Sequence, residues 1–218
     1  MYPKIIMHNS ISLNGAVNGF EADMATHYGV LNQLKGDAVM VGSQTILDAA
    51  ADIPPVPKKI TGKPKKASDK TLPWWVVVDG KGKLKKQLHY FRNMEFIRDI
   101  IVLTTEDVSQ DYLDFLLERD FEVISAGNKK VDIESCLTLL HSHYKIKTLV
   151  TDSGPALNDL LLEKKLISEV SLVMMPELVT AKHKCIFQNL KKKVNLKLIS
   201  AGSIDHTMVH LSYKVINK

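Results

Sequence analysis

Small and polar residues gather at four places along the chain, each directly after a run of apolar residues. The four segments are Asn9 to Gly15, Gly42 to Asp48, Asp79 to Gly82 and Asp152 to Asn158. In an open α/β sheet the carboxyl ends of parallel strands meet at one edge, where backbone groups and helix N-termini bind ligands. The pattern therefore predicts that these segments line a ligand site at such an edge.

The segment around Asp152 is the most informative of the four. The chain passes from an apolar run through Ser153 and Gly154 directly into a helical pattern. Small residues let a diphosphate approach the backbone, and a helix N-terminus supplies unpaired N–H groups and a partial positive charge. The alternative is ordinary helix-start chemistry, in which Ser153 caps the helix and Pro155 occupies its first turn. Spacing alone leaves both interpretations open.

The other glycine-containing segments fit no standard nucleotide motif. Gly42 to Thr45 offers hydroxyl and N–H groups at a second strand end, or a second helix cap. Gly80-Lys81-Gly82 resembles half of a dinucleotide fingerprint, but the third glycine is absent and no segment matches a Walker loop. The sequence contains no zinc-protease helix motif and no serine-hydrolase elbow, so it lends no support to either chemistry.

Alternating apolar runs and amphipathic stretches predict the elements that position these segments. Tyr28, Leu31 and Leu34 are expected to share a face of a first helix, and Asp132 is expected to cap another whose apolar positions include Cys136. The alternation is typical of an α/β fold with a mostly parallel central sheet, and the absence of a helix between the last two strands predicts an antiparallel finish. The expected strands are 4–10, 37–42, 74–79, 100–103, 121–124, 148–151, 169–174, 196–200 and 207–215, and the later helices lie near 110–118, 133–143 and 156–166.

Composition bounds the class of protein. With 218 residues, 45% of them hydrophobic, the chain is long enough for one sizeable core, and we expect a single domain over 1–218. Residues 53–71 hold four prolines and six lysines without periodicity, which predicts a long mobile loop. No apolar run is long enough to span a membrane and the N-terminal residues lack a secretory pattern, so we expect a cytoplasmic protein with Cys136 and Cys185 reduced.

Taken in order along nearly the whole chain, these segments resemble the reductase family of riboflavin biosynthesis, both its free-standing members and the C-terminal half of the bifunctional deaminase-reductase. Asn9-x-x-Ser12-Leu13-Asn14-Gly15 is similar to the family's opening "S/T-L-D-G". Asp37 to Thr45 is similar to "D-x-x-x-V-G-x-x-T", and Val77-Val78-Asp79 to "V-V-D/L-D". The most specific piece runs from Asp152 to Asn158, followed by Leu166 to Leu172 and Pro176, and resembles "E-G-G-P/G-x-L-N … L-V-D-E-x-x-L … P".

The resemblance implies a three-layer α/β/α fold like that of dihydrofolate reductase, a homodimer, and NADPH as the cofactor. It further implies reduction of the ribosyl group of a small phosphorylated pyrimidine to a ribityl chain. Asp152, which replaces the family's glutamate, would orient the substrate or supply a proton to its imine nitrogen. The substrate would face Asn9, Ser12, Asn14 and Asp48. The cofactor would lie along Thr45, Asp79, Gly80, Lys81, Gly127, Asn128, Ser153, Gly154, Pro155 and Ala156, with Lys81 near its 2′-phosphate.

Most departures from the family pattern fall on the substrate side. Asn14 stands where the family has an aspartate, and the stretch from Asp48 to Pro55 is rewritten. One alternative is therefore a dihydrofolate-reductase-like enzyme with another pterin or pyrimidine substrate, with Glu21 or Asp23 as its acid. Another is a non-catalytic basic module, because the formal charge is +5 and lysines cluster. Nucleic acid is a poor candidate partner, since no aromatic residues are interleaved with those lysines.

Overall fold

The computed structural model describes residues 1–50 and 69–216, and its internal contacts divide the chain into two compact units. Unit 1 contains residues 1–3 and 37–147, and unit 2 contains residues 4–36 and 148–218. Most of the predicted loop 53–71 lies outside the described residues, and the single domain stays a prediction.

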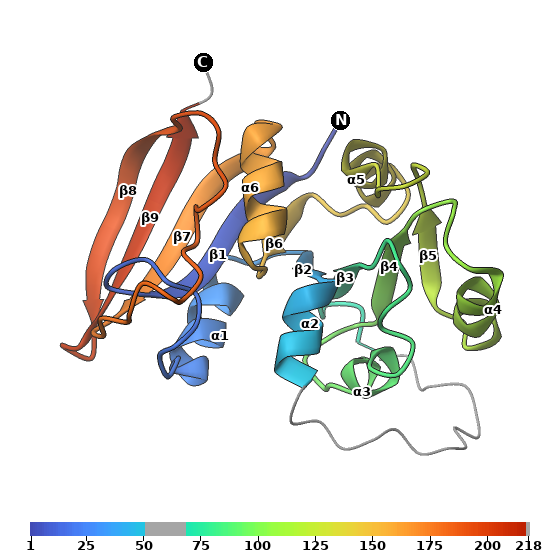
Figure 1. The fold of residues 1–218 in the computed structure, drawn as a ribbon, viewed down its shortest axis with the longest axis horizontal. Coiled ribbons are helices and arrows are strands. Elements are labelled where there is room, and N and C mark those ends of the chain that lie inside the picture. The colour runs from blue at the N-terminus through green and yellow to red at the C-terminus, as the bar shows by residue number, and fades with distance from the viewer. Residues whose placement is uncertain (51–68, 217–218) are drawn as a thin grey trace. The chain divides into compact units, whose positions relative to one another are not determined.

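Unit 1 is built on four parallel strands in the order β5-β4-β3-β2 (Figure 1). Their apolar runs are buried, with Val76, Val77 and Ile101 fully inaccessible, as expected for parallel strands covered on both faces. The strands are β2 (Ala38–Gly42), β3 (Trp74–Val78), β4 (Ile100–Thr104) and β5 (Glu122–Ser125). The helices are α2 (Ser43–Ala49), α3 (Leu88–Arg92), α4 (Gln110–Glu118) and α5 (Ile133–Ser142).

Sequence patterns placed two of these four helices, α4 and α5, correctly, and α2 was anticipated only as the helix-cap alternative at Gly42. Asp132 caps α5 by accepting from the backbone N–H groups of Glu134 and Ser135, and Cys136 is buried on the inner face of that helix. The five residues of α3 were not expected, since so short a helix carries no periodicity. It is held by Arg92, whose buried guanidinium lies 2.6 Å from Asp99 and donates to the carbonyl of Arg119.

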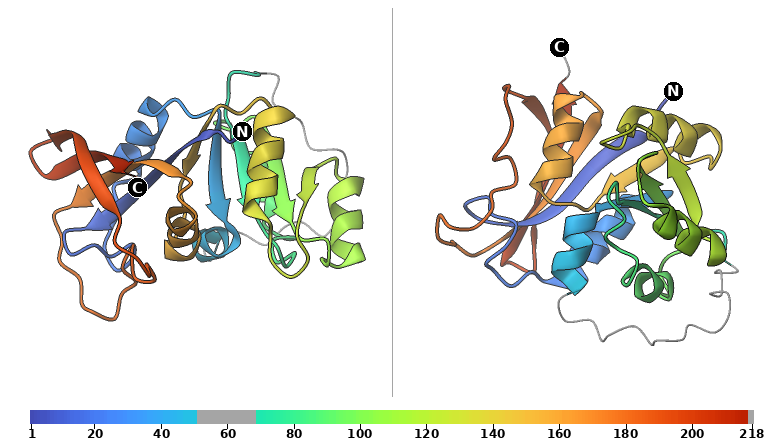
Figure 2. Two further views of the ribbon diagram at one scale, coloured as in Figure 1. Left: turned by 90° about the horizontal axis from the view of Figure 1, so that it is seen from above. Right: turned by 45° about the vertical axis from the view of Figure 1, so that its right-hand side comes forward.

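Unit 2 has five strands in the order β6-β1-β7-β9-β8, of which the first three are parallel and the last two antiparallel. This confirms the predicted antiparallel finish. Figure 2 shows α1 and α6 on opposite faces of the parallel strands. The elements are β1 (Lys4–Ser12), α1 (Met24–Gln33), β6 (Thr148–Thr151), α6 (Pro155–Glu163), β7 (Ile167–Met175), β8 (Asn195–Ile204) and β9 (Met208–Ile216).

The buried face of α1 differs from the one expected. His27, Val30 and Leu31 are buried, whereas Tyr28 is 38% exposed. On the face predicted to hold Tyr28, Leu31 and Leu34, Tyr28 is thus partly exposed and Leu34 half-buried, and the buried positions are those of His27, Val30 and Leu31. The physical reason is that His27 hydrogen-bonds to polar groups of β1, so a polar residue occupies the inner face.

Candidate active site

In unit 1 the strand-end carboxylate Asp79 is inaccessible and turned into its own loop. Its Oδ1 accepts from the backbone N–H of Lys83 at 3.0 Å, and its Oδ2 accepts from Leu84 N at 2.9 Å and from the Tyr112 hydroxyl at 2.9 Å. Burial, and then the charge of Asp79, raise the pKa of Tyr112, so this hydroxyl stays a donor. Asp79 thus closes the β3–α3 loop, and any contact with a cofactor there has to come from its neighbours.

The loops that follow β3, β4 and β5 meet at the carboxyl ends of these strands. The Thr105 hydroxyl donates to the carbonyl of Gly80 at 2.9 Å, and Glu106 N donates to the carbonyl of Gly127 at 2.8 Å. A Cβ added to Gly80 would lie 3.0 Å from the side chain of Val131. The structure therefore brings Gly80 and Gly127, two of the predicted cofactor residues, onto adjoining loops.

Two glycines shape these loops. Gly127 has a φ of +77°, and an added Cβ would lie 2.9 Å from Asp132 N and closer still to the Lys130 carbonyl. Gly82 has a φ of +63°, and its Cβ would lie 2.8 Å from the Tyr112 ring. Both positions need glycine, because other residues rarely adopt this conformation and have no room for a side chain. In the Gly80-Lys81-Gly82 segment, which resembles half of a dinucleotide fingerprint, Gly82 is therefore required by its packing against Tyr112.

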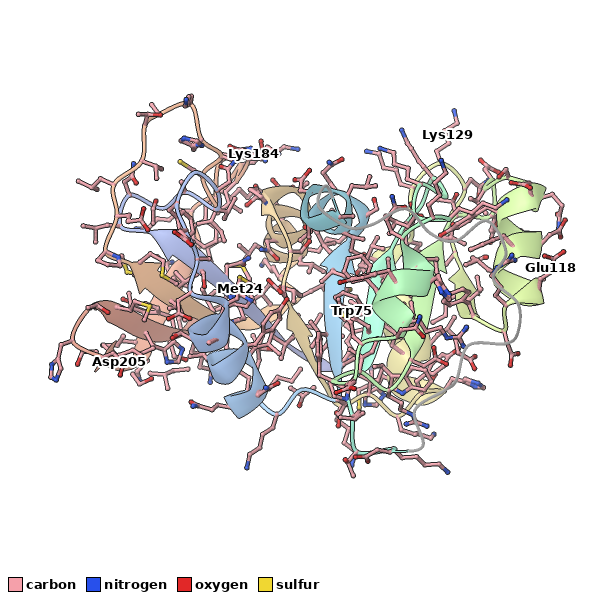
Figure 3. All side chains as sticks on the ribbon, turned by 90° about the horizontal axis from the view of Figure 1, so that it is seen from below. Met24, Trp75, Glu118, Lys129, Lys184 and Asp205 are labelled. Atoms are coloured by element: carbon pink, nitrogen blue, oxygen red, sulfur yellow. The ribbon has the colours of Figure 1, made fainter. Side chains whose placement is uncertain are left out.

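Exposed cationic side chains surround the same strand ends. Lys81, Lys83 and Lys86 belong to the β3–α3 loop. Lys129 and Lys130 belong to the β5–α5 loop, and Lys129 extends away from the ribbon in Figure 3. This edge of unit 1 therefore favours an anionic ligand. Exposed Lys81 and Asn128 and half-buried Gly127 offer backbone and side-chain donors.

The other predicted residues of unit 1 lie on α2. Thr45 is half-buried in the first turn, and Asp48 is exposed, with its Oδ1 accepting from Gln44 Nε2 at 2.7 Å. Gly42 is the residue before the helix, and no side chain caps this N-terminus.

In unit 2 a buried network of amides fixes the loop between β6 and α6. Asn9 Nδ2 donates to the carbonyl of Ser153 at 2.9 Å, and Asn158 Nδ2 donates to the same carbonyl at 2.7 Å and to Asn9 Oδ1 at 2.9 Å. The Thr151 hydroxyl completes the network by donating to Asn158 Oδ1 at 3.0 Å. Asn9 and Ser153 are both buried, so they position the loop that carries Asp152.

The N-terminus of α6 is different from the capped start that was one interpretation of the sequence. The residue before the helix is Gly154, Pro155 is its first residue, and no side chain caps it. Ser153 is therefore not the cap. Ala156 is exposed in the first turn. A helix start of this kind presents backbone donors and a partial positive charge, which suits a phosphate group.

Ser12 and Asn14 hold the loop after β1. The Ser12 hydroxyl donates to Asn14 Oδ1 at 2.8 Å, and Asn14 Nδ2 donates to the carbonyl of Val179 at 2.8 Å. Val179 N donates back to Asn14 Oδ1 at 3.1 Å. Asn14 thus fastens this loop to the segment after β7, a contact 165 residues apart in sequence.

Asp152 is the strand-end carboxylate of unit 2 that remains partly accessible. Its side chain is 20% exposed, and its Oδ2 lies 3.2 Å from Nε2 of His27. His27 Nδ1 lies 2.9 Å from the Ser10 hydroxyl. The sequence interpretation missed His27, although its spacing to Val30 and Leu31 is that of a buried helix face. The site therefore has a carboxylate with an imidazole behind it, next to an uncapped helix start.

A second buried histidine, His8 of β1, contacts the backbone of α1. His8 Nε2 lies 3.2 Å from the His27 carbonyl, which only accepts, so Nε2 carries the proton and Nδ1 accepts from the Ser171 hydroxyl at 3.0 Å. The Ser171 hydroxyl in turn lies 2.9 Å from His210 Nε2. Burial, reinforced by His27, lowers the pKa of His8 to about 4. His8 is therefore neutral at neutral pH.

Over residues 1–50 and 69–216 the side chains of His, Cys, Asp and Glu form no group of three or more that could hold a metal ion. Within those same ranges no helix has the length and apolar character needed to cross a bilayer.

The fold and this site define a class of protein. Parallel strands with flanking helices and three final strands that turn antiparallel are the arrangement of dihydrofolate-reductase-like enzymes. Dihydrofolate reductase from Enterococcus faecalis, solved with NADP(H) and the ligand RAB-propyl, matches with a TM-score of 0.54 at 9% identity over 100% of both chains. The predicted fold class is thereby confirmed.

Residues 3–210 match the family model described as RibD C-terminal domain, and the chain belongs to this family. The resemblance to the riboflavin-pathway pyrimidine reductases is confirmed, and it identifies the chain as a member of an oxidoreductase family. No curated protein matches the sequence.

Solved structures share the fold at low identity. A pyrimidine reductase-like protein from Corynebacterium diphtheriae has a TM-score of 0.77 and 20% identity, with 99% of this chain and 93% of that chain covered. The diaminohydroxyphosphoribosylaminopyrimidine deaminase/5-amino-6-(5-phosphoribosylamino)uracil reductase of Thermotoga maritima has a TM-score of 0.67 and 17% identity, with 99% of this chain covered. The present chain spans 57% of that longer protein.

Proposed function

We propose that the protein is an NADPH-dependent reductase of riboflavin biosynthesis that converts the ribosyl group of a diaminopyrimidine 5′-phosphate, or of the related aminouracil, into a ribityl chain. Family membership supports the reaction class. The observation that carries the proposal is Asp152, a partly accessible carboxylate at a strand end beside the uncapped start of α6. A carboxyl group there can donate a proton, while the helix start favours a phosphate.

The residues present fit a pyridine dinucleotide phosphate. In unit 1, the loops of Gly80 and Gly127 are proposed to contact the cofactor through backbone groups, while the space beside each glycine is filled by Val131 or by Lys130 and Asp132. Exposed Lys81 offers a charge for a 2′-phosphate. Asn128 and half-buried Thr45 add polar groups, and Asp79 contributes by closing its loop. In unit 2, residues 153–156 form the uncapped start of α6. When bound, the cofactor supplies the hydride.

The proposed reaction needs one proton as well as the hydride. The ribosylamine opens to an imine, its C1′ accepts the hydride, and the imine nitrogen accepts a proton from the carboxyl of Asp152. A proton from water then restores the carboxyl. Asn9 and Asn158 hold the loop carrying Asp152, and Ser12 and Asn14 hold the loop after β1 on the proposed substrate side. Asp48 of α2 stays a proposed substrate contact.

A homodimer is part of the proposal. β8 is the edge strand of unit 2, and every residue from Asn195 to Ser203 is exposed. Leu198 and Ile199 are each 53% exposed. An edge strand this long with exposed apolar side chains is suited to being covered by a second copy.

One of the two alternative acids, Asp23, is engaged as a helix cap. Asp23 caps α1 by accepting from Thr26 N at 3.0 Å, and this hydrogen bond lowers its pKa, so it stays an ionised cap. The cytoplasmic location stays a proposal that follows from the class of reaction.

Calorimetric titration with NADPH, then with NADH, tests the cofactor. We expect micromolar binding of NADPH and weaker binding of NADH. Loss of NADPH absorbance is then followed with the phosphoribosylaminouracil and with the diaminopyrimidinone phosphate. Oxidation with either compound supports the proposal, and no binding at millimolar NADPH contradicts it.

A further inference from the structure

Directly behind Asp152 lies a buried imidazole with a polar partner on each nitrogen. His27 is 4% exposed, with Nε2 3.2 Å from Asp152 Oδ2 and Nδ1 2.9 Å from the Ser10 hydroxyl. The Ser10 hydroxyl of β1, the His27 imidazole of α1 and the Asp152 carboxylate of the β6–α6 loop thus follow one another within contact distance. Within the described residues Nε2 forms no hydrogen bond, and its contact with Asp152 is one of distance and charge, so the free energy of burying this nitrogen depends on the carboxylate staying near it.

Packing fixes the orientation of the His27 ring. The His8 ring lies 4.7 Å away between centroids, and the Tyr28 ring packs edge-on at 5.1 Å. The backbone is held as well, because the His27 carbonyl accepts from His8 Nε2 at 3.2 Å. An imidazole restrained in this way can restrain a carboxylate that contacts it.

The ionisable groups nearest the pair are His8, Tyr28 and, beyond Ser171, His210. His8 packs against His27 from β1 and is neutral, because burial lowers its pKa to about 4. His210, which reaches Ser171 from β9, also has a lowered pKa through burial. Burial and the charge of Asp152 raise the pKa of Tyr28 to about 12, so Tyr28 remains uncharged.

We infer that His27 is a positioning residue for the reduction: it holds Oδ2 of Asp152, so that the carboxyl group presents one orientation to the substrate. This inference rests on the proposed function. His27 itself does not touch the substrate, and its role is exerted through Asp152. Because misplacing a reacting group slows the chemical step more than it weakens binding, the effect belongs in kcat.

A double-mutant cycle tests the inference. In His27→Phe we expect kcat with the phosphoribosylaminouracil to fall about 10- to 100-fold, with KM changed by less than about threefold. Asp152→Asn should lower kcat further. The double variant should be no slower than Asp152→Asn alone, because the imidazole has nothing left to position.

Two further variants keep the test independent of folding. His27→Gln retains an N–H donor near the position of Nε2 and should recover part of the kcat lost in His27→Phe. Ser171→Ala removes the hydroxyl beneath His8 without touching Asp152. It should lower the stability and leave kcat within about twofold of the wild type, since it does not disturb the proton donor.

The outcomes separate the inference from the proposed function. Three results would each overturn the positioning role while leaving the reductase activity intact. They are kcat losses of the two single variants that multiply in the double variant, a change in KM without a change in kcat, and a kcat loss in Ser171→Ala equal to that in His27→Phe. If the wild-type protein reduces neither pyrimidine, the proposed function fails and the role of His27 in it fails too. Urea unfolding of the four proteins of the cycle (wild type, His27→Phe, Asp152→Asn and the double variant) tests the contact between His27 and Asp152 without reference to activity. If the contact forms, the losses of unfolding free energy in the two single variants should not add up in the double variant.

Discussion

Asp79 and Asp152 each follow a buried parallel strand directly, yet the structure uses them in opposite ways. Asp79 in unit 1 is inaccessible and accepts three hydrogen bonds, from two backbone N–H groups and Tyr112. Asp152 in unit 2 is partly exposed and contacts His27, while Asn9 and Asn158 hold its loop. In the loop after β3 the carboxylate of Asp79 is used up by hydrogen bonds within the loop, so backbone groups there, and not this carboxylate, can contact a ligand. In the loop after β6 side-chain amides hold the loop, so the carboxylate of Asp152 stays partly accessible.

Matched substitutions at the two aspartates should give the largest difference. In Asp152→Asn we expect kcat to fall about 10²- to 10³-fold, with a smaller loss of stability than in Asp79→Asn, because the proposed proton donor is lost at a partly exposed position. In Asp79→Asn an amide donor faces existing donors, which should cost about 2–3 kcal/mol of unfolding free energy. Urea unfolding and steady-state kinetics on both variants check this. Equal losses of unfolding free energy in the two variants would show that the two aspartates do not differ in their structural roles.

The buried histidine of unit 2 predicts an acid-sensitive stability. His8 has a folded-state pKa of about 4 against an ordinary value of 6.5, so the unfolded chain binds the extra proton first as the pH falls. Stability is complete above about pH 6.5 and should decline by about 3 kcal/mol by pH 4, with no further loss from this group below that.

His8→Gln provides the control for this pH dependence. It keeps an N–H donor for the His27 carbonyl but does not titrate, so its unfolding free energy should change less between pH 7 and pH 4. His210, whose pKa is also lowered, should contribute in the same direction. An unchanged slope in His8→Gln would show that other groups cause the decline.

Two glycines with similar backbone angles offer a finer test of the loops. Gly127 in unit 1 has a φ of +77° with backbone atoms in the way of a Cβ, whereas Gly15 in unit 2 has a φ of +83° and open space. Substitution of Gly15 by Ala should cost about 1 kcal/mol, from backbone strain alone. Gly127→Ala should cost at least about 2 kcal/mol and weaken NADPH binding. Thermal unfolding measures the stability of both variants, and calorimetry measures their NADPH binding. Equal stability losses in the two variants would show that crowding around Gly127 adds nothing to the backbone strain.

The smallest expected effect concerns the exposed lysines. Lys81→Ala should weaken NADPH about fivefold, which is about 1 kcal/mol, and should leave NADH unchanged. Lys192→Ala in unit 2 removes the same charge from an exposed lysine cluster and serves as the control. Calorimetry at low and moderate salt checks this, and an equal effect of both substitutions would point to net charge alone.

The sequence predicted the fold far better than the contacts of the site. Apolar runs such as Trp74 to Asp79 indicate buried parallel strands because burial on both faces leaves no polar alternation. The same logic gave the helix capped by Asp132. Whether a strand-end aspartate closes a loop or faces a ligand depends on partners far along the chain. Tyr112, 33 residues after Asp79, is such a partner, and local pattern does not reveal it.

His27 shows a second limit. A helical period defines a stripe but fits two neighbouring stripes about equally well over so short a helix, and the apolar ring of Tyr28 favoured the wrong one. The inner stripe contains His27 because Ser10 and Asp152 supply polar partners. Those partners lie 17 residues before it and 125 after it, so the burial of this imidazole is a property of the folded unit.

The exposed strand β8 also limits how copies of this chain can associate. A free strand edge can in principle add further copies without end, because each added sheet exposes a new edge. Pairing about a twofold axis closes this edge, since each β8 then covers the other and no β8 edge remains for a further copy. The ten-residue length of β8 makes that symmetric closure a protection against fibre growth as well as a route to a dimer.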